Sequence, residues 1–254
     1  MAQIIAFANQ KGGVGKSTLC IQAAFYLALK KRKKVLVVDM DAQGNATSTL
    51  LNSEDFTGTR SEELFSPELE KINVQHCLNK VDLIGSSLDD DSGYDTESLP
   101  LELAAQPKIH IDKIRDQYDF ILIDCPPSLG RRLLSALLAT DYVVCPVKLS
   151  GYAVLGLSRL FSTLIKVKNE FNPDLGILGA IINEYDGSAS HRKALESVKE
   201  ILGDRVFTHY IRHRPPIDTA SCGMPIWEVP NGQRAAQELA AVYNELLKRI
   251  KDAD

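Results

Sequence analysis

Two lysines and three glycines stand together near the N-terminus, in the run Lys11-Gly12-Gly13-Val14-Gly15-Lys16-Ser17-Thr18. Glycines allow consecutive backbone N–H groups to turn inward around phosphate oxygens, and a helix that begins there adds the positive end of its dipole. Lys16 would reach the β- and γ-phosphates of a nucleotide, and the Ser17 hydroxyl would ligate Mg²⁺. The run therefore predicts a loop that binds and hydrolyses ATP with Mg²⁺.

This loop departs from the usual P-loop pattern. Gln10 stands where that pattern has its first glycine, and Lys11 adds a second lysine directly before the double glycine. A glycine-rich turn that only joins a strand to a helix would account for the glycines, but not for the paired lysines. We therefore favour phosphate binding over a plain connection.

Three acidic residues lie at or just beyond the ends of apolar segments that are predicted to be strands, where they could contribute to a phosphate site. Asp39 and Asp41 follow Val35-Leu36-Val37-Val38, and Asp124 follows Phe120-Ile121-Leu122-Ile123. Ligands of open α/β sheets bind at the carboxyl ends of strands, so we expect the three carboxylates beside the phosphate loop. One such acid could equally cap a turn, but two such strands together with the loop favour a site.

Around these residues the chain resembles the ParA/MinD family of deviant-Walker ATPases. The loop of that family reads KGGxGK[ST]T, and its later motifs are similar to Asp39-Met40-Asp41-Ala42-Gln43-Gly44-Asn45-Ala46-Thr47 and Asp124-Cys125-Pro126-Pro127-Ser128. The likeness extends from Ile4 to about Leu247 and is greatest to the short ParA proteins that partition plasmids and chromosomes. It includes Val206-Phe207 and Gly223-Met224-Pro225-Ile226.

The resemblance implies a homodimer in the ATP state, in which two subunits enclose two ATP molecules. Lys11 of each subunit would cross to the phosphates held by the other, and Asp41 would orient the attacking water, so Lys11, Lys16 and Asp41 are the expected catalytic residues. Asp39 and Asp124 would support Mg²⁺ through water. Phosphoryl transfer depends mostly on positioning and charge neutralisation, which agrees with these roles. Slow basal turnover, stimulated by a ParB-like centromere-binding protein, is also implied.

Two further residues are assigned to the nucleotide by the same resemblance. Asn183 closes an apolar segment at the place where family members contact adenine. Arg212 lies in Tyr210–Pro216, which loosely matches the nucleotide- and DNA-contacting loop of the family. A strand-ending asparagine could instead cap a turn, so this alternative stays open.

In ParA proteins the ATP-bound dimer holds DNA non-specifically, which requires only basic residues at DNA phosphates. Each basic residue alone would more often be a solvated surface charge, but a late cluster in an otherwise acidic chain favours DNA. Relatives often carry an arginine after a Tyr-Asp pair, whereas here Gly187-Ser188 follows, so we expect the contact to shift towards Arg192. The cluster consists of Arg192, Lys193, Lys199, Arg205, Arg212, His213 and Arg214.

Short apolar runs alternate with longer amphipathic segments, as is typical of βαβ units. We predict one ParA-like ATPase domain over residues 1–254, an α/β fold with a doubly wound, mainly parallel sheet. The predicted strands are Ile4–Ala8, Val35–Asp39, Val81–Gly85, Phe120–Asp124, Tyr142–Val147, Leu178–Asn183 and Val206–Ile211. The predicted helices are Lys16–Leu29, Arg131–Ala139, Leu155–Glu170, His191–Leu202 and Arg234–Lys251.

Two stretches have weaker periodicity. We interpret Leu51–Leu78 and the acidic Asp89–Glu97 as helical excursions and loops on the surface. The acidic piece is interpreted as a solvated loop rather than a site.

The composition is that of a soluble globular protein, with 44% hydrophobic and 24% charged residues. A net charge of −4 excludes a global positive field, so any DNA contact must be a local patch. The five cysteines have no CxxC spacing, and neither a signal-like leader nor an apolar stretch of about 18 residues is seen. We therefore expect a cytoplasmic protein without membrane contact, and the resemblance to ParA proteins implies that it is nucleoid-associated in the ATP state.

Three alternative functions use the same kind of loop. A MinD-like membrane-cycling ATPase needs a C-terminal amphipathic helix, but Ala241–Asp254 ends acidic, and we expect it to pack on the core. A ParA-like ATPase that positions a protein cargo would keep the ATP switch and the DNA surface. An iron–sulfur reductase would need bridging cysteines, and Cys125 has no partner at a suitable spacing.

Overall fold

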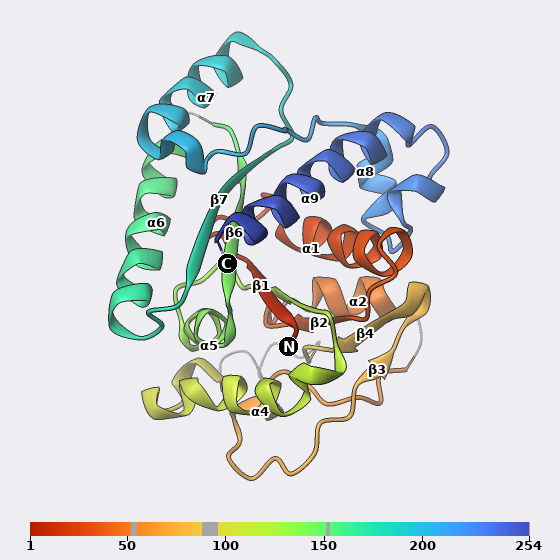
Figure 1. Cartoon of the computed structure of the whole chain (residues 1–254), viewed down its shortest axis with the longest axis vertical. Coiled ribbons are helices and arrows are strands. Elements are labelled where there is room, and N and C mark those ends of the chain that lie inside the picture. Colours follow the sequence, from red (N-terminus) through yellow and green to blue (C-terminus); the bar gives the residue numbers. More distant parts are fainter. Residues whose placement is uncertain (52–54, 88–95, 151–152, 254) are drawn as a thin grey trace.

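The computed structural model describes residues 1–51, 55–87, 96–150 and 153–253. Within these residues a seven-stranded sheet has the order β3-β4-β2-β5-β1-β6-β7 (Figure 1). Neighbouring strands are parallel, except that β3 is antiparallel to β4. The strands are β1 (Gln3–Phe7), β2 (Val35–Asp39), β3 (Gln75–His76), β4 (Val81–Ile84), β5 (Phe120–Asp124), β6 (Tyr142–Lys148) and β7 (Gly176–Asn183).

Helices cover both faces of this sheet, which confirms the predicted doubly wound α/β class (Figure 1). One face packs on α1, α2 and α9, and the other packs on α4, α5, α6 and α7. The helices are α1 (Lys16–Phe25), α2 (Asn45–Leu51), α4 (Gln106–Ile114), α5 (Arg131–Ala139), α6 (Ala153–Glu170), α7 (Ala189–Leu202), α8 (Pro215–Ala220) and α9 (Gln233–Ala253).

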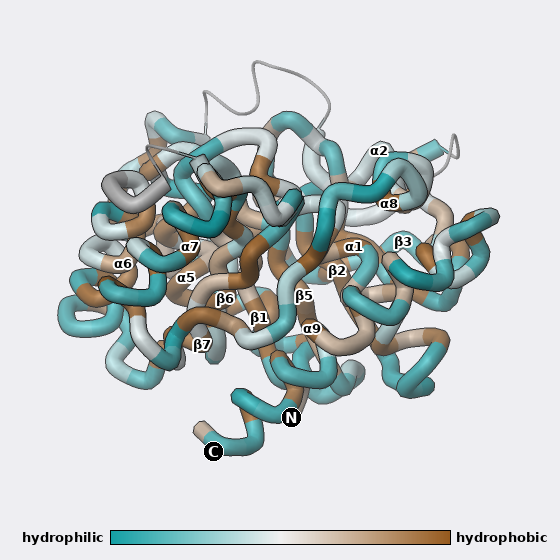
Figure 2. The backbone as a smooth tube through the Cα atoms, turned by 90° about the horizontal axis from the view of Figure 1, so that it is seen from above, coloured by the Kyte–Doolittle hydropathy of each residue, from teal (hydrophilic) through white to brown (hydrophobic). Residues whose placement is uncertain are grey.

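The interior positions of β1, β2 and β5 are apolar because both faces of these strands are covered. All five residues of β2 and all five of β5 are buried. In β1, Ile4 and Ala6 enter one core while Ile5 and Phe7 enter the other. Figure 2 shows the same arrangement, with hydrophobic segments inside and hydrophilic turns outside. Such strands present their polar residues only where they end, which places those residues at the sheet edge.

The predicted strand Val206–Ile211 is wrong. Phe207 and Ile211 donate to backbone oxygens of β7, but the backbone N–H groups of Thr208 and His209 donate to the Glu245 carboxylate on α9. A side chain from another element therefore takes the donors that a strand ladder would use. Only isolated bridges remain, at Val206 and Arg212.

Other differences concern short or irregular elements. The first predicted helix begins at Lys16 as expected, but it changes into a π-helix over Tyr26–Lys30. The helices α2, α4 and α8 and the strand β3 were not predicted, since each is short or lacks a strong apolar period.

The interpretation of Leu51–Leu78 as a surface segment is wrong in part, because Leu64 and Phe65 are buried in the core beside α4. They form a short 3-10 turn over Glu63–Phe65. Most of the acidic stretch Asp89–Glu97 lies outside the described residues. Thr96 and Glu97 at its end are described, and both contact α5.

Candidate nucleotide site

The glycine-rich loop joins the end of β1 to the start of α1. Gly13 and Gly15 have φ angles of 69° and 90°, in the left-handed region that glycine adopts most easily. Gly15 is also the residue before α1, so the loop turns directly into the first helical N–H groups. Lys16, the first residue of that helix, is only 6% exposed. The local backbone is therefore shaped as an anion-binding loop at a helix N-terminus.

A cavity of about 370 Å³ lies over this loop. Lys16 and Ser17 line it from α1, while Asp41 and Gln43 line it from the segment after β2. The other lining residues are Gly12, Gly13, Gly15, Thr18, Ile21, Asn45, Thr49, Pro127 and Ser221. The cavity thus combines a basic side chain, inward backbone groups and one carboxylate.

The acids Asp39 and Asp124 end two adjacent parallel strands, where they are register partners. Phe7, the last residue of β1, is the register partner of Asp124 on the other side. The phosphate loop follows β1, so the strand order alone brings both acids beneath it. Asp41 lies two residues beyond Asp39 and donates its backbone N–H to an oxygen of Asp39.

Asp39 is fully buried and hydrogen-bonded within its own segment. Its Oδ2 accepts from the backbone N–H and the hydroxyl of Thr47, at 2.8 and 2.7 Å. Burial raises the pKa of Asp39 to about 6, although the hydrogen bonds from Thr47 act in the opposite direction. Asp39 is therefore a carboxyl group that holds its proton more tightly than usual in the absence of a cation.

Asp124 is also fully buried, and neither of its oxygens accepts a hydrogen bond at ordinary distance within the described part of the chain. Burial and then the charge of Asp39 raise the pKa of Asp124 well above its ordinary value, while the Ser17 hydroxyl and the Lys16 charge act in the opposite direction. A carboxylate with unused oxygens next to Ser17 is suited to a hydrated Mg²⁺ ion.

No set of three or more His, Cys, Asp or Glu side chains in the described ranges is arranged to hold a metal ion by itself. Mg²⁺ usually keeps several waters and binds through one or two carboxylates together with substrate phosphates, and Asp124 has two buried oxygens beside Ser17. The residues beneath the loop therefore fit Mg²⁺ that arrives with a nucleotide.

Lys11 lies on the exposed side of the loop, unlike Lys16. Its backbone N–H donates to Asn9 Oδ1 at 3.0 Å, and its ammonium donates to the Ser150 hydroxyl at 3.4 Å. Asn9 is itself held by the carbonyl of Pro146. Lys11 does not line the cavity of its own subunit, so its ammonium is directed away from the phosphates that Lys16 would bind.

A second, smaller cavity of about 100 Å³ adjoins the first and shares Gly15, Thr18 and Ser221 with it. Asn183 and Arg212 both line this cavity. The Asn183 amide donates to the Val14 carbonyl at 2.9 Å, while its buried Oδ1 has no partner within the described residues. The structure therefore places both residues beside the loop.

The predicted basic cluster is divided in the structure. Arg192, Lys193 and Lys199 are exposed on α7, and Arg205 is exposed in the turn that follows. Arg214 instead binds Glu238 at 2.6 Å and lines the small cavity with Arg212 and His213. Its charge is compensated locally, so α7 carries the more available cations.

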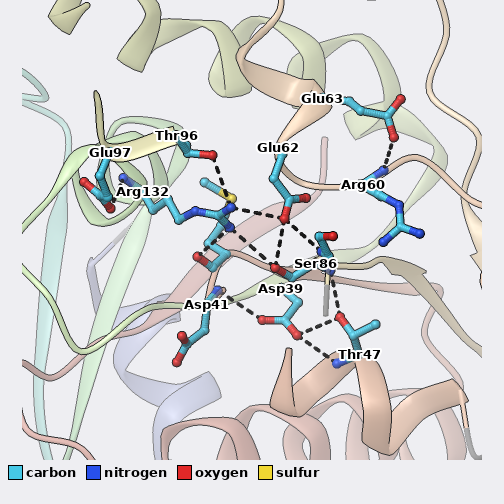
Figure 3. Close-up of polar contacts among 12 residues, drawn as sticks. Asp39, Asp41, Thr47, Arg60, Glu62, Glu63, Ser86, Thr96, Glu97 and Arg132 are labelled. Atoms are coloured by element: carbon cyan, nitrogen blue, oxygen red, sulfur yellow. Dashed lines mark hydrogen bonds and ion pairs between the residues drawn. The ribbon is translucent and has the colours of Figure 1, made fainter. Parts of the chain in front are cut away.

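Several residues that lie in this region were not predicted from the sequence. Ser221 reaches the cavity from beyond α8, and no local pattern marks it. Arg132 on α5 is 1% exposed, with its guanidinium behind the Asp39–Asp41 turn (Figure 3). The spacing of Arg132, Ala136 and Ala139 could have placed Arg132 on the buried stripe of its helix.

The C-terminal helix α9 packs on the core, as expected. Leu239, Val242, Tyr243 and Leu246 on its inner face are all buried against the α1 side of the sheet. Across the ranges that the structure describes, no helix combines the length and the apolar character needed to cross a membrane.

Comparison with known proteins places these features in a family. An AAA domain model matches residues 2–177. The chromosome-partitioning ATPase Soj of Thermus thermophilus is 35% identical over 258 residues, which cover 98% of this chain and 97% of Soj. A Borrelia burgdorferi structure, described as a putative plasmid partition protein bound to AMPPNP, has a TM-score of 0.82, 28% identity and coverage of 98% and 100%.

A third similar protein has a solved structure that contains magnesium. The structure of cobyrinic acid a,c-diamide synthase from Mycobacterium smegmatis, with bound ADP and magnesium, has a TM-score of 0.81 and 25% identity. It covers 100% of this chain and 97% of the synthase chain. All three relatives are similar to this chain over nearly its full length.

Proposed function

Because the chain belongs to the ParA/Soj/MinD family of AAA-domain ATPases, we propose that it hydrolyses Mg-ATP in order to partition plasmid or chromosomal DNA. One ATPase domain over residues 1–254 would dimerise with ATP, bind DNA non-specifically and be reset by a ParB-like activator. The observation that carries the proposal is the loop cavity, which Lys16 and Asp41 line together.

The proposed roles follow from where each side chain lies. Lys16 and the backbone N–H groups of the loop bind the phosphates, because Gly12, Gly13, Gly15, Lys16, Ser17 and Thr18 line the cavity at a helix N-terminus. Asp41 is the carboxylate among the residues that line the cavity, so it orients the attacking water. Ser17, Asp39 and Asp124 hold Mg²⁺, the two acids through water. When bound, Mg²⁺ neutralises charge on the phosphate oxygens.

The position of Lys11 supports a role in a dimer. Its ammonium is exposed and turned from its own cavity, so it is free to neutralise phosphates bound by a second subunit. A lysine that arrives only on dimerisation ties hydrolysis to the closed state and gives slow basal turnover. Asn183 and Arg212 contact the base and its surroundings, since they line the adjoining cavity.

The alternatives have less support. A MinD-like membrane cycle would use α9, but the apolar face of α9 is already buried in the core. Positioning of a protein cargo would use the same ATP and DNA sites and differs only in the partner. The relatives named as partition proteins favour DNA as the cargo.

The test is binding of the full-length protein to a random-sequence DNA duplex at about 50 and 200 mM salt, with ATP, with ADP and without nucleotide. Phosphate contacts release counterions, so binding should require ATP and weaken steeply with salt. Absence of DNA binding, together with ATP-dependent binding to anionic vesicles, would instead support the membrane cycle.

A further inference from the structure

Arg132 is a charged residue in the interior, in the first turn of α5. Its side chain is 2% exposed and lies directly behind the turn that carries Asp39 and Asp41 (Figure 3). It is absent from the lining of the nucleotide cavity, so it does not touch the substrate site. A buried guanidinium is costly unless it is paired and hydrogen-bonded, and its surroundings therefore indicate what it does.

The guanidinium joins four segments of the chain. Nη1 donates to the Met40 carbonyl and to the Ser86 hydroxyl, both at 3.4 Å. Nη2 donates to the Thr96 hydroxyl at 3.2 Å and pairs with Glu62 at 3.1 Å. Burial opposes ionisation of Glu62, yet its hydrogen bonds and the charge of Arg132 lower its pKa. The pair is therefore ionised and locally neutral.

Hydrogen bonds to Asp124, Arg132 and Thr47 hold the Asp39–Asp41 turn. The Met40 N–H donates to the Asp124 carbonyl at 2.9 Å, and the Met40 carbonyl accepts from Arg132. Asp39 is held by Thr47, whose hydroxyl in turn accepts the N–H of Ser86 at 2.8 Å. Arg132 and Thr47 meet at Ser86, so one polar network supports both ends of the turn.

Stability alone gives no reason for a buried ion pair, because well-packed apolar residues of similar volume are often as stable. We infer that Arg132, neutralised by Glu62, is a positioning residue that holds the Met40 carbonyl and so fixes Asp41 for water attack. This inference rests on the proposed role of Asp41 in ATP hydrolysis. It implies that α5 must be in place for hydrolysis, because its first turn supplies the guanidinium that binds Met40.

The double variant Arg132→Met/Glu62→Leu separates positioning from stability, because it removes both charges and keeps most of the volume. The measurements are the urea midpoint, and kcat and KM for ATP, both corrected for the folded fraction. We expect a midpoint closer to wild type than either single variant gives, an ATP KM within about twofold, and a kcat lower by roughly tenfold to a hundredfold.

Thr96→Val is the matched control, since it removes another partner of Arg132 without touching Met40. Its kcat should remain within about threefold of wild type. A folded double variant with wild-type kcat would overturn the inference. If Asp41→Ala also keeps its turnover, the role of Asp41 fails; if only the double variant does, the failure is confined to Arg132.

If the double variant does not fold, the single variant Arg132→Lys tests the positioning role of Arg132. Lysine keeps the charge beside Glu62, but a single ammonium cannot reproduce the planar fork that reaches Met40, Ser86 and Glu62 together. A reduced kcat at unchanged KM is the expected result. Wild-type kcat in a folded Arg132→Lys protein would overturn the inference.

Discussion

At the scale of single residues, the proposed roles divide the site into groups that bind the nucleotide and groups that promote its hydrolysis. Lys16 and Ser17 face the cavity from the start of α1, whereas Asp41 faces it from the segment beyond β2. Binding and hydrolysis should therefore be separable by substitution.

Lys16→Gln and Asp41→Ala are expected to fail at different steps. Lys16→Gln removes the buried cation of the loop and should abolish ATP binding. Asp41→Ala should bind ATP and dimerise but lose turnover by roughly a hundredfold or more, because the water is no longer oriented. Nucleotide binding, gel filtration and phosphate release distinguish the steps. The exposed Lys108→Gln is the control, and unchanged turnover in Asp41→Ala would remove Asp41 from catalysis.

The two buried acids predict a pH dependence of known sign. Burial raises the pKa of Asp39 from 3.8 to about 6, and the pKa of Asp124 is raised as well. The folded protein without nucleotide then binds these protons more tightly than the unfolded chain does. The stability that Asp39 contributes is present in full below about pH 4 and is lost as the pH rises through about 6.

Binding of Mg-ATP should consequently release protons near pH 6, because carboxylates that support Mg²⁺ must be ionised. Calorimetry in two buffers of different ionisation enthalpy measures this release, which should diminish at pH 8. Asp124→Asn should reduce the release at pH 6 and stabilise the nucleotide-free protein at pH 7, because it removes a buried carboxyl group whose ionisation is opposed by burial. The exposed Asp116→Asn should do neither; an equal release in Asp124→Asn would contradict the assignment.

At the scale of elements, α9 determines the conformation of the segment that follows α7. The Glu245 carboxylate accepts from the backbone and hydroxyl of Thr208, from the His209 backbone and ring, and from Arg249. Burial opposes ionisation, but these hydrogen bonds lower the pKa of Glu245 to about 2. The Glu245 carboxylate thus accepts the hydrogen bonds of Thr208 and His209 that a neighbouring strand would otherwise accept.

Glu245→Gln should destabilise the fold by about 1 kcal/mol at pH 7, because the amide loses charge-assisted hydrogen bonds in a partly solvated position. A lowered pKa contributes stability above about pH 4.5 that is lost as the pH falls towards about 2. The difference between variant and wild type in urea unfolding should therefore shrink below pH 4.5. A difference that is constant with pH would mean that charge is not involved.

At the scale of the whole molecule, Arg192, Lys193 and Lys199 form an exposed basic group on α7, far from α4 at the other end of the long axis (Figure 1). Arg214, in contrast, is compensated by Glu238 beside the nucleotide. In the proposed DNA complex we therefore expect α7, rather than Arg214, to contribute phosphate contacts.

The variant Arg192→Ala/Lys193→Ala should bind DNA more weakly in the ATP state, with a salt dependence reduced by about 0.9 for each DNA phosphate that is no longer neutralised. The plot of log affinity against log salt concentration measures this slope, while ATP turnover remains near wild type. Lys108→Ala on α4 is the control. An unchanged slope in the α7 variant would place the DNA surface elsewhere.

The sequence by itself determined the phosphate loop and the acids that end β2 and β5. These features are local, because a buried strand needs an apolar run and a phosphate loop needs glycines and lysine at fixed spacing. Their convergence followed from the rule that parallel strands present their carboxyl ends at one edge. The family motifs added roles for Lys11 and Asn183 that composition and periodicity do not contain.

Only the tertiary structure decided which distant groups meet. Arg132 lies 92 residues from Met40 and 46 from Ser86, and Glu245 lies 37 from Thr208. Such pairs depend on how helices pack on the sheet, and a local pattern records burial without recording the partner. That is why Val206–Ile211 reads as a strand although a carboxylate on α9 accepts hydrogen bonds from its backbone, and why the spacing in α5 indicates burial of Arg132 without indicating its contact with Met40.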